Sequence, residues 1–357
     1  MPERLLSADS HVKVSQDQIK ANLPGRLHAA YDEAVAKFQA RIAGGAGRAN
    51  AKGAQMGVGG RNAAFTRPGY GDPVERLKDM DADGVEAEVI YSEVSAFRYL
   101  ADLAEGASEA TRAFNDVLTW FSEADPKRLV VTYQIPIHDI DAAVAEVNRV
   151  AGLGARSLQL PVFPPEFGLA DYYHERYEPL FGAIQETGLP ICCHIGLNTG
   201  LDDLNRRDPT PQKGIMVPMT PLTSAEALGM WIMGGVFERF PDLKVVFVEP
   251  GLGWVSWWVQ TVDDMVLRQG YDFPAIKELP SYYFHRNVHL TFIEEPDGVQ
   301  LLRHRLGVEN LLWSTDYPHP VTSWPNSRQV VDEQFAGVPA DERELMLSGN
   351  AARVWNL

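Results

Sequence analysis

The sequence predicts a closed (β/α)₈ barrel, also called a TIM barrel, on three observations. First, eight apolar runs rich in β-branched residues have the character of buried strands: Leu5–Asp9, Val85–Tyr91, Leu129–Ile137, Ser157–Pro161, Pro190–Ile195, Lys244–Glu249, Val288–Ile293 and Leu311–Asp316. Second, these runs are apolar throughout, which is typical of parallel strands covered on both faces. Third, helical patterns separate the runs, and 357 residues exceed a typical barrel of ~250 by roughly 100. An open, doubly wound sheet is the alternative.

Two of the helices between the strands carry start signals. Asp139 precedes apolar residues at helical spacing as far as Val150, and Gly152 and Gly154 follow them as a stop signal. Ser108 stands before a second helical pattern and predicts its first residue.

The chain is predicted to be one domain, residues 1–357, with an insertion at about 15–75 that follows the first strand. Within the insertion, the tract from Gly44 to Asn50 and the four glycines after it predict a mobile loop, placed to act as a lid over the barrel mouth. A phosphate-binding loop is disfavoured, because the Walker spacing and its Lys-Ser/Thr pair are missing.

Composition excludes several classes of partner. A net charge of −16 argues against nucleic acids and anionic membranes. No run approaches the ~18 apolar residues of a membrane span, and from the N-terminal residues we expect no signal peptide. The two cysteines, Cys192 and Cys193, are adjacent in an apolar run, which predicts buried free thiols and a cytoplasmic location.

Acids and histidines terminate several predicted strands. Asp9 and His11 are two residues apart at the end of the first strand, His194 ends the fifth, and Asp316 ends the eighth. Because the carboxyl ends of barrel strands meet at one mouth, we expect these side chains to share a metal site. Imidazole and carboxylate ligands together suit Zn²⁺, Mn²⁺ or Fe²⁺. Taken singly, each signal also fits a helix cap, a surface turn or a hydrogen-bonded core histidine.

Further residues near these ends are weaker candidates. Glu249 ends the sixth strand, where it could bind the metal, orient a water or act as an acid, or be only a capping carboxylate. His319, three residues after Asp316, is expected to contact substrate or support the site. His304 lies on a predicted helix face and is expected at the surface. The tryptophans from Trp254 to Trp258 predict packing or a homodimer interface, and Trp254 a wall of the pocket.

These motifs resemble the amidohydrolase superfamily, specifically the amidohydrolase-2 branch that includes aminocarboxymuconate semialdehyde decarboxylase. The resemblance rests on Asp9-Ser10-His11, the segment from Arg76 to Val85, the approach to His194, and Trp313-Ser314-Thr315-Asp316-Tyr317-Pro318-His319. It implies that Asp9, His11, His194 and Asp316 bind a divalent metal, with one position open for water or substrate.

The chain departs from the family pattern at two positions. The usual first-strand pattern is His-x-His, and the first member here is Asp9, which favours oxygen-preferring ions such as Mn²⁺. Many decarboxylases of this branch have a catalytic histidine, followed by two glycines, where this chain has Glu249. An unperturbed glutamate with a pKa near ~4.3 is a fixed anion at neutral pH and a poor proton donor.

The sequence therefore favours a metal-dependent hydrolase of an amide, ester, lactone or acyl thioester. Metal-bound water would attack the carbonyl, Asp316 would take the proton from that water, and His194 or His319 would help to hold the oxyanion. The alternative is a metal-dependent, non-oxidative decarboxylase of an aromatic or unsaturated acid. A barrel that keeps its metal only for structure is the third possibility, disfavoured because open sites of mixed ligands seldom serve structure alone. In each enzyme the expected partner is a small-molecule substrate.

Overall fold

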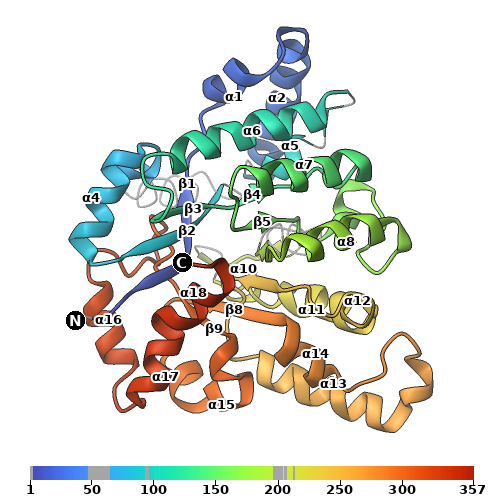
Figure 1. Cartoon of the computed structure of the whole chain (residues 1–357), viewed down its shortest axis with the longest axis vertical. Helices are drawn as coiled ribbons and strands as arrows, with labels where there is room; N and C mark the ends of the chain where they lie inside the picture. The colour runs from blue at the N-terminus through green and yellow to red at the C-terminus, as the bar shows by residue number, and fades with distance from the viewer. Residues whose placement is uncertain are drawn as a thin grey trace.

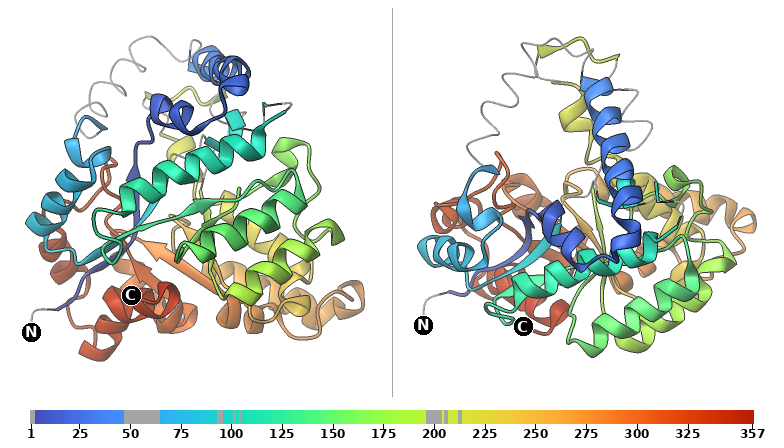
Figure 2. Two further views of the ribbon diagram at one scale, coloured as in Figure 1. Left: turned by 45° about the horizontal axis from the view of Figure 1, so that its top comes forward. Right: turned by 90° about the horizontal axis from the view of Figure 1, so that it is seen from above.

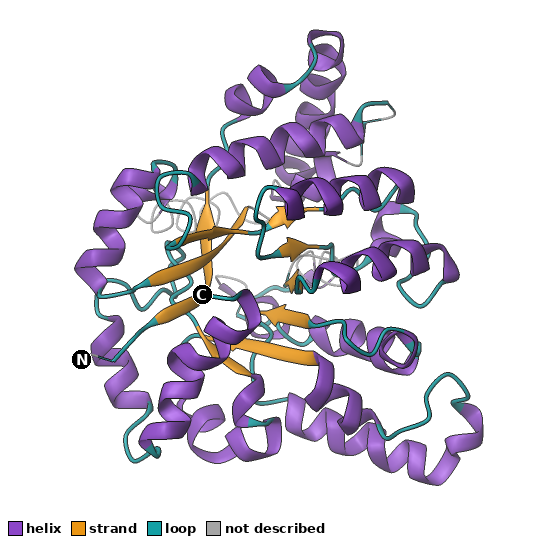
Figure 3. Ribbon diagram, in the orientation of Figure 1, coloured by secondary structure: helices purple, strands orange, loops and turns teal. Residues whose placement is uncertain are grey.

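A computed structural model describes residues 3–46, 65–92, 96–100, 102–103, 105–195, 204, 207–211 and 214–357. Parallel strands form its centre and helices surround them (Figures 1 and 3). The strands are β1 (Leu6–Val12), β2 (Ala87–Ser92), β3 (Leu129–Val131), β4 (Tyr133–Gln134), β5 (Leu158–Gln159), β6 (Ile191–His194), β7 (Val245–Val248), β8 (Val288–Phe292) and β9 (Leu311–Trp313). Each lies within or beside a predicted apolar run.

The strands close into a ring. Two parallel sheets run in the order β1-β2-β3 and β4 to β9. Thr132 joins them, because its N–H donates to Ile90 of β2 at 2.9 Å while the N–H of the next residue, Tyr133, donates to Ser157 at 3.1 Å. At the other seam the N–H of Asp316 donates to the carbonyl of Asp9 at 3.0 Å. Because hydrogen bonds cross both seams, the barrel is confirmed and the open sheet is excluded. Strands β3 and β4 together occupy one of the eight positions in the ring.

The helices of the described residues are mostly short. They are α1 (Gln16–Asn22), α2 (His28–Ala46), α4 (Pro73–Asp83), α5 (Ala96–Leu100), α6 (Ala107–Ser122), α7 (Ile140–Gly152), α8 (Glu178–Thr187), α10 (Met216–Met219), α11 (Thr223–Met233), α12 (Val236–Arg239), α13 (Val255–Gln269), α14 (Pro280–Asn287), α15 (Arg303–Leu306), α16 (Ser327–Gln334), α17 (Ala340–Glu344) and α18 (Asn350–Trp355). None of them is long and apolar enough to cross a membrane.

Capping explains where the two predicted helices begin. Asp139 caps α7, as expected, by accepting from the N–H of Ala142 at 3.0 Å. For α6 the prediction was wrong, because the cap is Gly106 and not Ser108. Gly106 has a φ of 87°, and a Cβ there would lie 2.6 Å from a methyl carbon of Leu27. Only glycine fits this close approach.

The insertion after β1 is partly helical. Its described residues include α1 and α2, which lie beside α6 and α5 (Figure 2). Helix α2 continues to Ala46 and so includes the first two glycines of the tract that was expected to be a loop. The rest of that tract, residues 47–64, lies outside the described residues.

Apolar side chains fill both sides of the barrel wall. Alternate strand residues point inward, where Ala8, Val89, Cys192 and Val246 form an interior cluster with α18. Helix α18 lies across the barrel in Figure 1, and the indole of Trp355 donates to Ser157 at 3.2 Å. The two cysteines are buried and free, as predicted.

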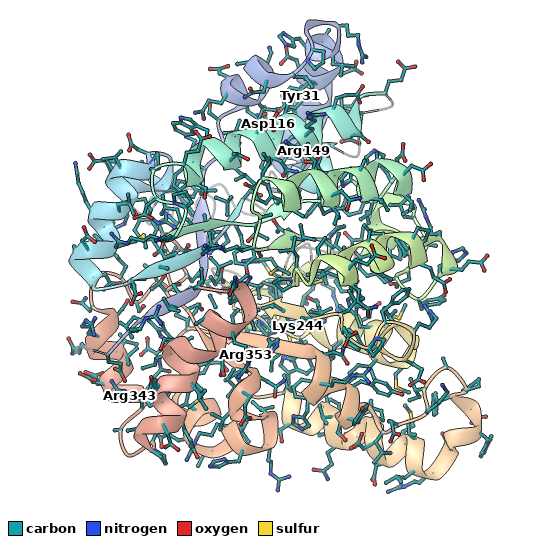
Figure 4. The ribbon with its side chains drawn as sticks, in the orientation of Figure 1. Tyr31, Asp116, Arg149, Lys244, Arg343 and Arg353 are labelled. Atoms are coloured by element: carbon teal, nitrogen blue, oxygen red, sulfur yellow. The ribbon has the colours of Figure 1, made fainter. Side chains whose placement is uncertain are left out.

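The helices outside the wall are also linked by charge. Asp116 on α6 and Arg149 on α7 point toward each other in Figure 4, with Oδ1 and Nη1 2.8 Å apart. This pair is partly exposed, so it adds little to the stability that the apolar layer already provides.

Candidate metal centre

The predicted ligands come from three strand ends at one mouth of the barrel. Asp9 and His11 lie in β1, where the register with β2 shifts between Ser7 and Ser10. His194 is the last residue of β6, and Asp316 follows β9 by three residues. The N–H of His11 donates to Tyr317 at 2.6 Å, so the first and last strands are locked together beside the site.

The structure brings these side chains within reach of one another. His11 Nε2 lies 3.1 Å from Asp316 Oδ1 and 3.7 Å from Asp9 Oδ1. His194 Nε2 lies 3.5 Å from Asp9 Oδ1. Ligand atoms of Asp9, His11 and His194 form one group within 4.8 Å, and those of His11, Asp316 and His319 form a second. The two groups share His11.

The donor atoms fit a cation because they are buried without other partners. Both carboxylate oxygens of Asp9 and of Asp316, and Nε2 of both His11 and His194, have no hydrogen-bond partner among the described residues. Anionic carboxylates are costly to bury unpaired, and a divalent ion would satisfy them together. Nδ1 of His194 is 2.9 Å from the carbonyl of Ile195, which leaves Nε2 facing the other ligands.

Charge and burial act strongly on the imidazoles. Burial, and then the neighbouring His319, hold the pKa of His11 well below its usual range. Burial also lowers the pKa of His194, but the carboxylate of Asp9 outweighs it and raises that pKa to about 10. Asp9 therefore holds a proton on His194 when no cation is bound, and a cation would take the place of that proton.

His319 lines the same mouth, as predicted. Its Nδ1 lies 3.1 Å from Asp316 Oδ1, and its ring stacks on that of His11 with centroids 4.0 Å apart. Burial lowers the pKa of His319, but the adjacent carboxylate of Asp316 outweighs this and raises that pKa. The ring of Phe65 makes an edge contact with the ring of His319, with centroids 5.4 Å apart. With 22% of its side chain exposed, His319 can meet both Asp316 and an incoming molecule.

Glu249 stands at the end of β7 in the left-handed backbone conformation, with a φ of 59°. Its N–H donates to the Thr291 hydroxyl of β8 at 2.8 Å, which holds this turn. Burial, and then the negative charge of Asp316, raise the pKa of its carboxyl to about 8. When no cation is bound, Glu249 is therefore mostly protonated at neutral pH, unlike the fixed anion that the sequence suggested.

One supporting pair was missed in the sequence. Arg76 on α4 is fully buried and donates from Nε to Glu88 Oε2 at 2.6 Å and from Nη1 to the carbonyl of His11 at 2.9 Å. Its guanidinium lies 4.1 Å from the ring centroid of Tyr317. Arg76 thus contacts the candidate ligand His11 and Tyr317, the residue that follows the candidate ligand Asp316. The only sequence signal was its place in the Arg76–Val85 motif, which does not reveal Glu88 as its partner.

Inward-facing residues of the middle strands were also missed. The ring of Tyr91 on β2 makes an edge contact with the ring of His194, with centroids 5.4 Å apart. Gln134 and Gln159, at the ends of β4 and β5, are fully buried. A single glutamine or tyrosine in a strand has no spacing that would mark it as functional.

The remaining candidates belong to neither ligand group of the described residues. His304 is exposed on α15, as expected. Trp257 is 66% exposed on α13, whereas Trp254 and Trp258 pack against the core. The indole of Trp254 donates to the carbonyl of Pro250 at 2.7 Å, next to Glu249 in the chain.

Curated relatives of this chain are decarboxylases. It is 25% identical over 280 residues to γ-resorcylate decarboxylase of Rhizobium sp. (strain MTP-10005), covering 72% of this chain and 81% of the relative. It is 23% identical over 291 residues to 2-amino-3-carboxymuconate-6-semialdehyde decarboxylase of Dictyostelium discoideum, covering 78% of this chain and 75% of the relative.

Solved structures share the fold over nearly the whole chain. The 5-carboxyvanillate decarboxylase of Sphingomonas paucimobilis has a TM-score of 0.75 at 23% identity, covering 99% of both chains. An Asp-to-Asn variant of the 5-carboxyvanillate decarboxylase of Novosphingobium aromaticivorans has a TM-score of 0.76 at 16% identity, covering 100% of this chain and 98% of the other. It holds manganese and 3-methoxy-4-hydroxy-5-nitrobenzoic acid.

These findings overturn the expectation of a hydrolase, because the named relatives and structures above are decarboxylases, and one of them holds manganese. The expectation rested on an ordinary pKa for Glu249, and burial raises that pKa to about 8. The sequence profile of the amidohydrolase family matches residues 8–357, and the chain therefore belongs to that family.

Proposed function

We propose that this protein is a metal-dependent, non-oxidative decarboxylase of an aromatic or unsaturated carboxylic acid. The observation that carries the proposal is the cluster of buried, otherwise unpartnered ligand atoms on Asp9, His11, His194 and Asp316. The activity of the relatives supports decarboxylation as the reaction at this cluster.

Two carboxylates and two imidazoles would hold the metal. This ligand set, richer in oxygen than a His-x-His site, suits Mn²⁺, the ion bound in the Novosphingobium enzyme. When bound, the ion would supply positive charge that holds the substrate carboxylate and an adjacent oxygen. Each remaining contribution to the reaction falls to side chains of the protein.

Glu249 is the proposed proton donor. As the bond between the carbon and its carboxylate breaks, CO₂ leaves and the electron pair stays on the carbon. That pair takes the proton of Glu249, and the ionised Glu249 regains a proton from solvent, so one proton is consumed for each CO₂ released. The pKa of about 8 in the metal-free protein supports this role, because an acid with that pKa carries its proton at neutral pH.

His319 is proposed to orient Asp316 and to contact the substrate. Its Nδ1 faces Asp316 Oδ1 at 3.1 Å, which leaves Nε2 free to face a substrate oxygen or the solvent. Stacking on His11 limits the rotation of the ring, so this contact would be held ready before substrate arrives.

The wider organisation follows the same proposal. We propose one barrel over residues 1–357 with its insertion at about 15–75, acting in the cytoplasm, where free Cys192 and Cys193 stay reduced. We also propose a homodimer that buries the exposed Trp257 of α13.

The proposal is tested with purified, manganese-loaded protein. Hydroxybenzoic acids and an unsaturated amino acid semialdehyde, each labelled with ¹³C in the carboxyl group, are supplied, and ¹³CO₂ is measured by mass spectrometry. We expect ¹³CO₂ from the wild-type protein and none after metal removal or in Asp316→Asn. Hydrolysis of activated esters without ¹³CO₂ from any acid would contradict the proposal.

A further inference from the structure

Two glutamines lie in the part of the barrel wall that supplies no metal ligand. Gln134 ends β4 and Gln159 ends β5, and these two residues are paired in the parallel register. Their chain neighbours Tyr133, Ile135, Leu158 and Leu160 all pack in the outer apolar layer. Because successive strand residues alternate between faces, both glutamines point into the barrel.

Three of the four polar atoms of these carboxamides lack hydrogen-bond partners among the described residues. Neither Oε1 nor Nε2 of Gln159 has a hydrogen-bond partner among the described residues, and Oε1 of Gln134 also has none. Nε2 of Gln134 donates to the hydroxyl of Ser92. Both glutamines are 0% exposed, and buried carboxamides are rarely left unpaired. The same combination, burial without a partner, marks Asp9, His11 and Asp316.

The strand order places these glutamines beside the metal centre. Gln159 is paired with Cys192, two residues before His194 on the same inward face of β6. Strand β5 holds the fourth position in the ring and β9 the eighth, so Gln159 faces the strand that leads to Asp316. A molecule bound at the metal therefore has the two carboxamides on one side.

We propose that Gln134 and Gln159 bind a neutral hydroxyl group of the acid whose carboxylate is held at the metal centre, and so determine substrate specificity. The inference rests on the proposed decarboxylase. A hydroxyl both donates and accepts, which matches the free oxygen of Gln134 and the free carboxamide of Gln159. A second charged group would fit poorly, because neither carboxamide carries a compensating charge.

The test compares Gln159→Met and Gln134→Met with wild type. Methionine keeps the length of the side chain but removes the donor and acceptor. Gln329→Met is the matched control, because Gln329 is exposed on α16 and donates to Glu333 alone among the described residues. Each manganese-loaded protein is given pairs of benzoic acids that differ by one hydroxyl group. Calorimetry measures Kd, and ¹³CO₂ release measures kcat/KM.

We expect wild type and Gln329→Met to prefer the hydroxylated acid of a pair. Gln159→Met should weaken binding of that acid about 10- to 100-fold and leave binding of its partner acid unchanged. Gln134→Met should have a smaller effect in the same direction, and it serves as the test if Gln159→Met does not fold. Equal losses for both acids, or an unchanged preference, would show that the glutamines only hold the barrel or trapped water, and would overturn the inference.

The outcomes separate this inference from the proposed function. If no acid releases ¹³CO₂ but the preference in Kd still depends on Gln159, the decarboxylase is wrong and the hydroxyl site stands. If ¹³CO₂ is released and the preference in Kd for the hydroxylated acid is unchanged in both glutamine variants, the decarboxylase stands and the hydroxyl site does not.

Discussion

Arg76 and Glu88 form a fully buried ion pair, with Nε and Oε2 2.6 Å apart, and Arg76 also donates to the carbonyl of the proposed metal ligand His11. Glu88 belongs to β2 and Arg76 to α4, so the pair joins the barrel wall to a surrounding helix. The same guanidinium faces Tyr317, the residue after Asp316. We therefore expect stability and metal binding to be linked through this one side chain.

Removing Arg76 should weaken both properties. Arg76→Met leaves Glu88 as a buried charge without its partner, so urea unfolding should show a loss of about 3–5 kcal/mol. Mn²⁺ affinity, measured by calorimetry, should fall about 10- to 100-fold because His11 and Tyr317 lose their support.

The control for this variant is Arg4→Met. Arg4 makes an ion pair of 2.8 Å with Glu86, but both side chains are about half exposed. Its loss should cost less than about 1 kcal/mol and leave Mn²⁺ affinity unchanged. Equal effects of the two variants would refute the special role of Arg76.

Metal content should depend on His194. His194→Ala removes a buried ligand, so elemental analysis should find far less bound Mn²⁺ than in wild type. His304→Ala, on the exposed side of α15, should bind a normal amount. Mn²⁺ at 100 times its Kd should stabilise wild type by about 2.7 kcal/mol and His194→Ala by much less. Full metal content in His194→Ala would remove it from the ligand set.

Activity should be lost as pH rises through about 8. Below this value Glu249 carries the proton that the carbon needs, and above it the carboxyl is ionised. Glu249→Gln keeps the shape but cannot supply a proton, so its kcat should be about 10²- to 10⁴-fold lower. The measurement is the pH profile of kcat from pH 5 to 10. If Glu249→Gln kept full activity and the same loss of kcat above about pH 8 as wild type, Glu249 would be excluded as the donor.

The same carboxyl should affect the stability of the metal-free protein. Its pKa is about 8 when folded and near 4.5 when unfolded, so the folded state binds the extra proton between these values. This contribution is complete below about 4.5 and is lost as pH rises to about 8. Urea unfolding of wild type and Glu249→Gln at several pH values should differ with this slope. Parallel curves would show that burial does not shift this pKa.

The oligomeric state should respond to Trp257. Trp257→Glu places a charge on the most exposed tryptophan of α13, so light scattering should find a monomer where wild type is a dimer. Trp120→Glu, at an exposed position of α6, is the matched control and should stay dimeric. A monomeric wild-type protein would refute the interface.

Local sequence patterns were sufficient to predict the barrel. A buried strand needs a run of apolar residues, and each such run lies beside a strand of the ring. A polar residue that ends such a run must lie at the mouth, because parallel strands share one direction, and this placed Asp9, His11, His194 and Asp316 correctly. Capping was less predictable, since the start of α6 depends on Leu27, far away in the chain.

By itself the sequence determined the strands, the ends that carry the site residues, and the family that they resemble, because each depends on neighbouring residues alone. Only the tertiary structure decided that Arg76 pairs with Glu88 and that the carboxamide of Gln159 is left without a partner. It also decided that burial and the charge of Asp316 raise the pKa of Glu249 to about 8. A pKa is set by burial and by charges that folding brings close, and these have no signature in the order of the residues.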